Sequence, residues 1–315
     1  MYEPLKLEPI YDRTIWASDR LCRIRHHKAD SYGTVWEMSV HPYAQSTVKN
    51  PQYHGQKLKD LIEKDPEGML GKKCTEMDLI RLAYLDAKDS LSVQVHPDEA
   101  YAVKNENDHG KTESWYILEA EPGATLVAGS DFTDKEQIRQ SLKDHTIMSH
   151  LRNVPVAAGD FICIEAGTLH ALGAGILAIE VGTNSNTTYR FYDYERKDDK
   201  GNERPLHLEK SLDVVNLASR PEVIHSPYHA DMAQKKTLLK RKEFTVELAD
   251  TAGSYVSSTD GNSYQVLSNM QAECLLKYEG GTMPLHFTET VFLPAALGKY
   301  EIIGSTRILI SSVQK

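Results

Sequence analysis

The chain has 315 residues and a formal net charge of −9 at neutral pH. This balance argues against general binding to nucleic acids or anionic membranes, which need clustered basic side chains. No apolar run approaches the length of a membrane span. The four cysteines are widely spaced, so we expect reduced thiols in a cytoplasmic protein. The length suits one large unit or a large domain with a smaller one.

Short apolar segments punctuated by glycine and proline predict a mainly β scaffold with a few short helices. In chain order, we expect an irregular lead-in over residues 1–25, a strand over 34–40, a helix over 55–63 and a loop over 66–75. Residues 79–86 fit either a helix or a buried strand, which periodicity alone does not separate.

Apolar and polar side chains alternate between residues 91 and 96, which is the period of a strand. Gln94 and His96 share its polar face, and Pro97 ends the ladder because it has no backbone donor. An amide and an imidazole therefore lie side by side on a rigid element. Taken alone, the segment is as easily an ordinary half-exposed strand.

The next elements alternate between strands and short helices. We expect a helical turn over 98–103 capped by Asp98, a loop over 105–111, strands over 112–118 and 124–128, a helix over 134–142 capped by Thr133, and a further helix over 145–151. Two strands joined by a tight turn at Gly159-Asp160 then lead to a loop that carries His170. Strands over 176–181 and 187–194, a charged turn over 198–202 and a helix over 208–217 complete this part.

We expect residues 221–242 to form a polar connector without regular structure. Beyond it, short strands are expected over 244–248, 255–258, 264–268, 273–278, 289–293, 300–303 and 307–312. Their spacing is typical of a small β-sandwich or jelly roll.

Gln94, His96, Glu113 and His170 form a candidate metal site. Two imidazoles and a carboxylate suit a catalytic divalent metal, zinc above all, and three ligands leave a position open for water or substrate. Gln94 could join through its carbonyl oxygen. Adjacent antiparallel strands can bring such positions together. A single residue of these types is more often structural or solvated.

A second candidate group is cationic. An extended chain over residues 188–196 places Arg190, Tyr192, Tyr194 and Arg196 on one face. Two guanidinium groups with phenol donors suit a phosphate or a carboxylate. Lys111, two residues before Glu113, adds a positive charge to the same region. The alternative is a surface strand stabilised by ion pairs.

Four motifs together resemble the type I mannose-6-phosphate isomerases in their short, Firmicutes-like bacterial form. They are Ser-Val-Gln-Val-His-Pro-Asp at 92–98, Gly-Lys-Thr-Glu-Ser-Trp-Tyr at 110–116, Ala-Gly-Thr-Leu-His-Ala-Leu-Gly at 166–173 and Thr-Thr-Tyr-Arg-Phe-Tyr-Asp-Tyr at 187–194. The resemblance implies duplicated cupin-type jelly-roll β-sandwiches: a catalytic domain over residues 1–235 with helical insertions, and a smaller C-terminal domain over 236–315 without a metal site.

The resemblance also implies a reaction and a ligand set. The family interconverts D-mannose 6-phosphate and D-fructose 6-phosphate through a cis-enediol. By resemblance, one zinc ion is held by Gln94, His96, Glu113 and His170, Arg190 and Lys111 are catalytic, and Arg196 binds the substrate phosphate. A sugar phosphate is then the expected partner of a monomer or weak homodimer. The general base stays open among His109, Lys111, Asp193 and a zinc-bound water.

The sequence departs from the family pattern at three places. Trp16-Ala17-Ser18 replaces Trp-Gly-Gly, the run before Asp86 differs, and Gly-Thr-Asn-Ser-Asn at 182–186 replaces a segment that often reads Gln-Gln/Asn-Ser-Ser-Asp. The last change motivates one alternative, a non-catalytic sugar-phosphate-binding cupin. A second alternative is an iron-dependent cupin oxygenase, because two histidines and one carboxylate also suit non-haem iron.

Overall fold

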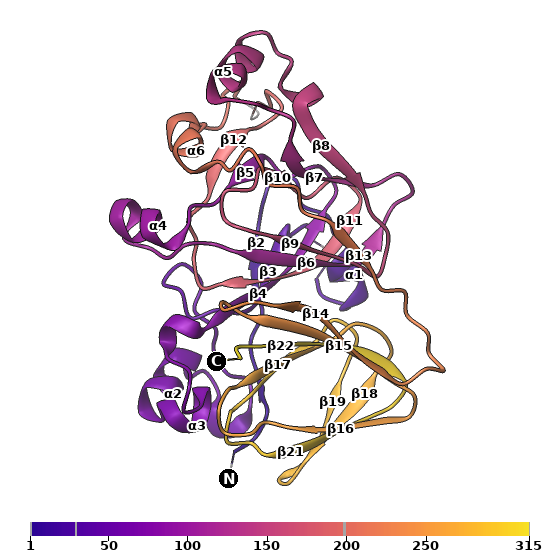
Figure 1. Ribbon diagram of the computed structural model, residues 1–315. Coiled ribbons are helices and arrows are strands. Elements are labelled where there is room, and N and C mark those ends of the chain that lie inside the picture. The colour runs from indigo at the N-terminus through magenta and orange to yellow at the C-terminus, as the bar shows by residue number, and fades with distance from the viewer. Residues whose placement is uncertain (1, 29, 198–199, 315) are drawn as a thin grey trace.

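Stacked antiparallel sheets dominate the computed structural model, which describes residues 2–28, 30–197 and 200–314 (Figure 1). From edge to edge, a seven-stranded sheet contains β13 (Val223–His225), β9 (Asp160–Ile164), β6 (Glu113–Ala120), β11 (Ile176–Thr183), β4 (Ile80–Ala87), β3 (Thr34–Met38) and β2 (Ile10–Asp12). A five-stranded sheet contains β12 (Tyr189–Tyr192), β5 (Val93–Val95), β10 (His170–Ala171), β7 (Thr125–Ser130) and β8 (Leu151–Pro155).

The C-terminal part supplies two further sheets. The six-stranded one contains β1 (Leu5–Lys6), β20 (Thr290–Leu293), β17 (Gln265–Asn269), β22 (Thr306–Ser312), β15 (Thr245–Thr251) and β14 (Gln234–Lys240). The four-stranded one contains β16 (Ser254–Ser258), β21 (Lys299–Ile303), β18 (Cys274–Tyr278) and β19 (Gly281–Leu285). The mainly β prediction is therefore confirmed. The N-terminal strand β1 pairs with β20, so the first residues complete a sheet built by the last ones.

Short helices lie between and beside the sheets. They are α1 (Arg20–Ile24), α2 (Leu58–Lys64), α3 (Pro66–Leu70), α4 (Glu99–Glu106), α5 (Lys135–Lys143) and α6 (Leu208–Val214), with 3₁₀ turns η1 (Pro51–Tyr53), η2 (Glu76–Asp78) and η3 (Ile147–His150). Figure 1 shows α5 and α6 at the end of the molecule that carries the five-stranded sheet, and α2 and α3 beside the C-terminal sheets.

Apolar side chains fill the spaces between neighbouring sheets. Leu126 packs in one cluster with Ile117, between the five- and seven-stranded sheets. Tyr84 and Phe292 belong to the cluster between the seven- and six-stranded sheets. Because both faces of the seven-stranded sheet are covered, every residue of β4 is buried. A strand buried on both faces has apolar residues on both and so shows no apolar–polar alternation. For this reason the sequence of residues 79–86 fitted a helix as well as a strand.

Several predicted boundaries were wrong. The lead-in contains strands β1 and β2 and helix α1, and the predicted loop at 66–75 begins with helix α3. The signal for α3 was present: Asp65 accepts a hydrogen bond from the backbone N–H of Gly68 at 3.0 Å, and Pro66 occupies the first turn. Asp98 caps α4 as predicted, but that helix continues to Glu106, into the expected loop.

Other corrections concern caps and edge strands. Asp134, not Thr133, caps α5, because its Oδ1 accepts from the backbone N–H of Gln137 at 2.8 Å. Within the helix expected over 145–151, only the 3₁₀ turn η3 (Ile147–His150) forms, and β8 begins at Leu151. The expected connector at 221–242 contains two edge strands, β13, which is only three residues long, and β14, whose polar residues concealed it. Strand β19 was also missed. The expected turn at 198–202 lies partly outside the described residues.

Candidate metal centre

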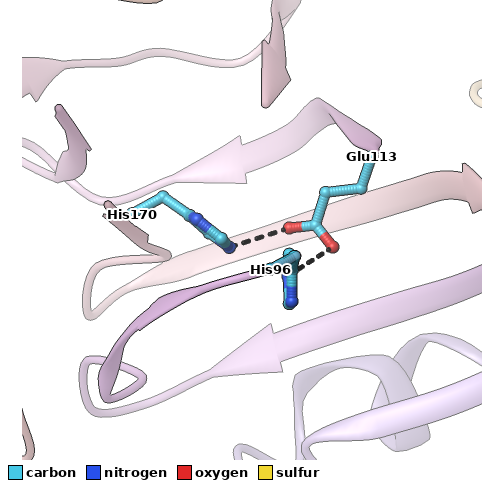
Figure 2. Close-up of side chains that lie close together, drawn as sticks. All are labelled: His96, Glu113 and His170. Atoms are coloured by element: carbon cyan, nitrogen blue, oxygen red, sulfur yellow. Dashed lines mark ion pairs between the residues drawn. The ribbon is translucent and has the colours of Figure 1, made fainter. Parts of the chain in front are cut away.

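His96, Glu113 and His170 converge in the interior (Figure 2). Nε2 of His96 lies 3.4 Å from Oε2 of Glu113, and Nε2 of His170 lies 3.2 Å from Oε1 of the same carboxylate. All three side chains are buried. The structure thus brings together three of the four residues proposed as metal ligands, from three separate segments of the chain.

Local backbone geometry explains how the two histidines meet. His96 follows the last residue of β5, directly before Pro97, and its carbonyl accepts a hydrogen bond from the backbone N–H of Gly167 at 2.8 Å. Gly167 has a φ of 85°, a left-handed conformation that suits glycine. The turn at Gly167 then leads into β10, whose first residue is His170. One backbone hydrogen bond therefore ties together the two loops that carry the imidazoles.

Each imidazole is oriented by a backbone carbonyl. Nδ1 of His96 lies 2.9 Å from the carbonyl oxygen of Thr187, and Nδ1 of His170 lies 2.8 Å from that of Thr168. A carbonyl can only accept, so Nδ1 carries the proton in both rings and both Nε2 lone pairs face Glu113. This is the tautomer in which a histidine ligates a metal through Nε2.

Unpaired polar atoms show that the cluster fits a cation. Nε2 of His96 and Oε1 of Glu113 are buried and have no hydrogen bond among the described residues, and Oε2 of Glu113 faces only the ammonium of Lys111 as a donor. Burying such groups without partners is costly. Two imidazole nitrogens and a carboxylate form a suitable donor set for a divalent metal with an open position. His96 and Glu113 therefore turn acceptor atoms toward one another, and a bound cation would give these acceptors a partner.

Gln94 lies beside this cluster. In the β5–β10 ladder it stands opposite His170, and its Nε2 lies 3.2 Å from Nε2 of that histidine. A half-turn of the amide about its last bond would place Oε1 there instead. Gln94 is therefore within reach of the centre, and its part in metal binding stays a prediction.

The ammonium of Lys111 lies between the carboxylates of Glu113 and Glu180, beside the cluster. Nζ of Lys111 lies 2.5 Å from Oε2 of Glu113 and 3.2 Å from Oε1 of Glu180. Burial alone would lower the pKa of Lys111, but the two carboxylates outweigh it and the net pKa is raised. Burial and the charge of Glu113 raise the pKa of Glu180. Burial raises the pKa of Glu113, but Lys111 and His96 bring it well below its usual value.

A cleft of about 660 Å³ opens beside the centre. Gln94, Lys111 and Glu180 line it together with Arg190 and Arg204. The cleft therefore places side chains that touch the metal cluster and two guanidinium groups on one continuous surface.

The arginines differ from the predicted arrangement. β12 ends at Tyr192, and Tyr194 has a positive φ of 56°, so residues 190–196 do not form one extended face. Arg190 stands opposite Gln94 in the β5–β12 ladder, and its Nε is buried without a partner among the described residues. Arg196 donates from Nη1 to the carbonyl of Ser90 at 2.7 Å and does not line the cleft.

Asp193 and His109 were two candidates for the general base. Arg196 and Arg204 both contact Asp193, whose pKa is lowered because these contacts outweigh burial. The ring of His109 faces Glu99, with Nδ1 3.0 Å from Oε1, and lines a different cleft. Neither side chain lies at the surface that connects the metal cluster to the arginines.

Glu180 and Arg204 line the cleft but were absent from the predicted site. The sequence did mark Glu180, because it is the one acidic residue in the apolar run 176–181 within β11. An ionisable residue in a doubly buried strand needs a partner. Arg204 lies in an irregular segment, where no periodicity marks it.

Comparison with known proteins assigns the chain to a family. Residues 6–140 match the family model of the catalytic domain of type I phosphomannose isomerase, and residues 234–313 match that of the mannose-6-phosphate isomerase cupin domain. The chain is 33% identical over 313 residues to a mannose-6-phosphate isomerase of Streptococcus mutans, covering 99% of this chain and 98% of that relative. The chain belongs to the type I phosphomannose isomerase family.

Solved structures of phosphomannose isomerases share the fold. The crystal structure of the Bacillus subtilis enzyme superposes with a TM-score of 0.87 at 31% identity, covering 98% of this chain and 99% of that one. A mannose 6-phosphate isomerase crystallised with zinc and yttrium superposes with a TM-score of 0.76 at 16% identity over the full length of both chains, a likeness of fold alone. The resemblance to type I phosphomannose isomerases and the cupin-type fold are confirmed.

No helix among the described residues is long and apolar enough to cross a membrane.

Proposed function

We propose that this chain is a zinc-dependent isomerase that interconverts D-mannose 6-phosphate and D-fructose 6-phosphate. The observation that carries the proposal is the buried His96–Glu113–His170 cluster, in which Nε2 of His96 and Oε1 of Glu113 have no hydrogen bond among the described residues, in a chain of this family. Gln94 is proposed as a fourth ligand. When bound, zinc would supply a Lewis acid that polarises the sugar oxygens.

The residues around the centre can hold and move protons. Lys111 lies against Glu113 and Glu180 as a protonated amine, and its Nζ is positioned at the cleft to donate to a sugar oxygen. Glu180, whose pKa is raised, is the carboxyl group that lines the cleft beside Lys111. We assign the transfer of a proton between C1 and C2, through a cis-enediol, to this pair; a well-placed acid–base group contributes about 10²–10⁴-fold in rate.

Arg190 is proposed to stabilise the negative charge that develops on the enediol. Its backbone is fixed by β12, and its Nη1 donates to the carbonyl of Pro205 at 2.9 Å, which leaves the buried Nε as an unused donor. Removing one such donor typically costs about 10²–10³-fold in kcat.

The substrate phosphate is proposed to bind at the cationic end of the cleft. Arg204 lines it, and Arg196 shares the carboxylate of Asp193 with Arg204. Guanidinium groups suit phosphate because they offer paired donors in one plane. All these residues fall within residues 1–235, which we propose as the catalytic domain; 236–315 is proposed to lack a metal site.

A coupled assay tests the proposal. Metal-free protein is expected to be inactive in converting mannose 6-phosphate to fructose 6-phosphate, and zinc is expected to restore the activity. Full activity in protein shown to contain no metal would contradict it. Binding of mannose 6-phosphate with zinc present but without turnover would favour a sugar-phosphate-binding cupin. Restoration by iron alone, with consumption of oxygen, would favour an oxygenase.

A further inference from the structure

Asp108 joins the loops on either side of the metal centre. It lies between α4 and β6, and its Oδ2 accepts hydrogen bonds from the backbone N–H of Asn186 at 2.9 Å and from the hydroxyl of Thr187 at 2.8 Å. The hydroxyl of Ser185 is 3.3 Å from the same oxygen. Oδ1 accepts from the backbone N–H of His109 at 2.8 Å. One carboxylate therefore binds two consecutive residues of the segment between β11 and β12, Asn186 and Thr187, and lies close to the preceding Ser185.

That segment delivers the carbonyl that orients a proposed metal ligand. The oxygen of Thr187 accepts the Nδ1 proton of His96. Residues 184–188 belong to no helix or strand, so a sheet ladder does not hold this carbonyl in place. Side-chain contacts hold it instead. They include those of Asp108, a hydrogen bond from the hydroxyl of Ser185 to the carbonyl of His109 at 2.6 Å, and a hydrogen bond from Nη1 of Arg81 to the carbonyl of Ser185 at 2.5 Å.

We propose that Asp108 is a positioning residue for the metal centre. By fixing the segment 185–187, it holds the Thr187 carbonyl against Nδ1 of His96, so that the ring keeps its proton there and presents Nε2 to the metal. The residue acts through Thr187 and touches neither metal nor substrate. This inference rests on the proposed function, because it requires that His96 bind a metal ion.

A neighbouring histidine supports the ionised carboxylate. Nε2 of His41 lies 3.4 Å from Oδ1 of Asp108. The backbone N–H of Tyr43 donates to Nδ1 of His41 at 3.1 Å, so the ring proton is on Nε2 and points to Asp108. Asp108 therefore receives donors on both oxygens, an arrangement that orients the carboxylate as well as satisfying it.

Glu99 is a matched control. Its Oε2 accepts from the backbone N–H of Gly110 at 2.8 Å and its Oε1 faces His109, so it binds the same loop as Asp108. No hydrogen bond joins it to residues 185–187 among the described residues. Glu99→Gln therefore removes a loop carboxylate without removing the link to Thr187.

The test measures zinc affinity by chelator competition in wild type, Asp108→Ala, Asp108→Asn and Glu99→Gln, and the ring nitrogen shifts of His96 in the metal-free proteins by NMR. Asp108→Ala is expected to weaken zinc binding by about 10–100-fold, the usual effect of losing an orienting group around a metal ligand, and to lose the single Nδ1–H form of His96. Asp108→Asn, which keeps one acceptor oxygen, is expected to lose less, and Glu99→Gln to match wild type.

Wild-type zinc affinity and an unchanged His96 tautomer in folded Asp108→Ala would overturn the inference while leaving the proposed function intact. If wild-type protein binds no zinc, the proposed function itself fails. If Asp108→Ala does not fold, the Thr187→Val variant tests the inference instead, because it removes only the hydroxyl contact to Asp108. It is expected to weaken zinc binding about fivefold, the worth of one hydrogen bond, and an unchanged affinity would overturn the inference.

Discussion

Gln94 stands directly opposite His170 across the β5–β10 ladder, with the amide Nε2 3.2 Å from the ring Nε2. On its other side, the same residue stands opposite Arg190 of β12. A strand of three residues thus sets the spacing between the metal cluster and the proposed catalytic arginine. The function of Gln94 is open to a direct measurement.

Gln94→Leu is expected to weaken zinc binding by about 10–100-fold, whether the amide ligates the ion or orients His170. The fold is expected to persist, because Val93 and Val95 carry the packing of this strand. Chelator competition gives the affinity, and circular dichroism monitors the fold. Zinc binding equal to wild type would remove Gln94 from the site.

Glu113→Gln is expected to abolish zinc retention and to lower isomerase activity by more than about 100-fold, since a direct ligand should matter more than an orienting group. Lys111 keeps Glu180 as a partner, so the protein should stay folded. Metal content after gel filtration and the coupled assay report the two effects. Glu165→Gln is the control, because Glu165 pairs with Arg241 on the surface. Retained metal and activity in Glu113→Gln would contradict the proposed site.

Arg204→Ala is expected to raise the KM for mannose 6-phosphate more than Arg196→Ala does. Arg204 lines the cleft, whereas the Nη1 of Arg196 is committed to the carbonyl of Ser90. Initial rates over a range of substrate give kcat and KM, and inhibition by inorganic phosphate reports the phosphate site separately. A larger rise in KM for Arg196→Ala would place the phosphate on Arg196, as the resemblance implies.

Asp108 should also contribute a pH-dependent stability. Burial alone would raise its pKa, but hydrogen bonds from Asn186, Thr187 and His109 lower the net pKa below the usual value. A depressed folded pKa favours the folded state above the unfolded pKa of about 3.9, and that advantage disappears as the pH falls through the folded value. The difference in unfolding free energy from Asp108→Asn, about 1–3 kcal/mol at neutral pH, should therefore persist at pH 5.5 and shrink below about pH 4. Denaturant titrations measure it, and a difference that grows on acidification would contradict it.

Arg307→Met is expected to lower stability strongly. The fully buried guanidinium pairs with Asp250, with Nε 2.5 Å from Oδ1 and Nη2 2.6 Å from Oδ2, and donates from Nη1 to the hydroxyl of Tyr116 in the other half of the molecule. Removing one partner of a buried pair costs about 3–5 kcal/mol, because the other charge is left uncompensated. Arg307→Met with Asp250→Asn should recover part of the loss in urea unfolding. A single variant as stable as wild type would contradict this.

The sequence by itself determined the β architecture and the residues of the metal cluster. Alternation put Gln94 and His96 on one face, and four ordered motifs connected them to Glu113 and His170. Local patterns sufficed for the strand of Gln94 and His96, because a strand period and a proline break are properties of consecutive residues, whereas the ligand set came from the resemblance of the four motifs to a known family. The same patterns failed at β14, where polar edge residues resemble a connector.

Only the tertiary structure decided how the cluster is held and which cations face the cleft. The carbonyl of Thr187 that orients His96 lies 91 residues away in the chain, and residues 190–196 leave the strand after Tyr192. Lys111 reaches Glu180 only because β6 and β11 are neighbours in one sheet. Such contacts join residues with no sequence relation, so strand pairing and burial, rather than periodicity, select them.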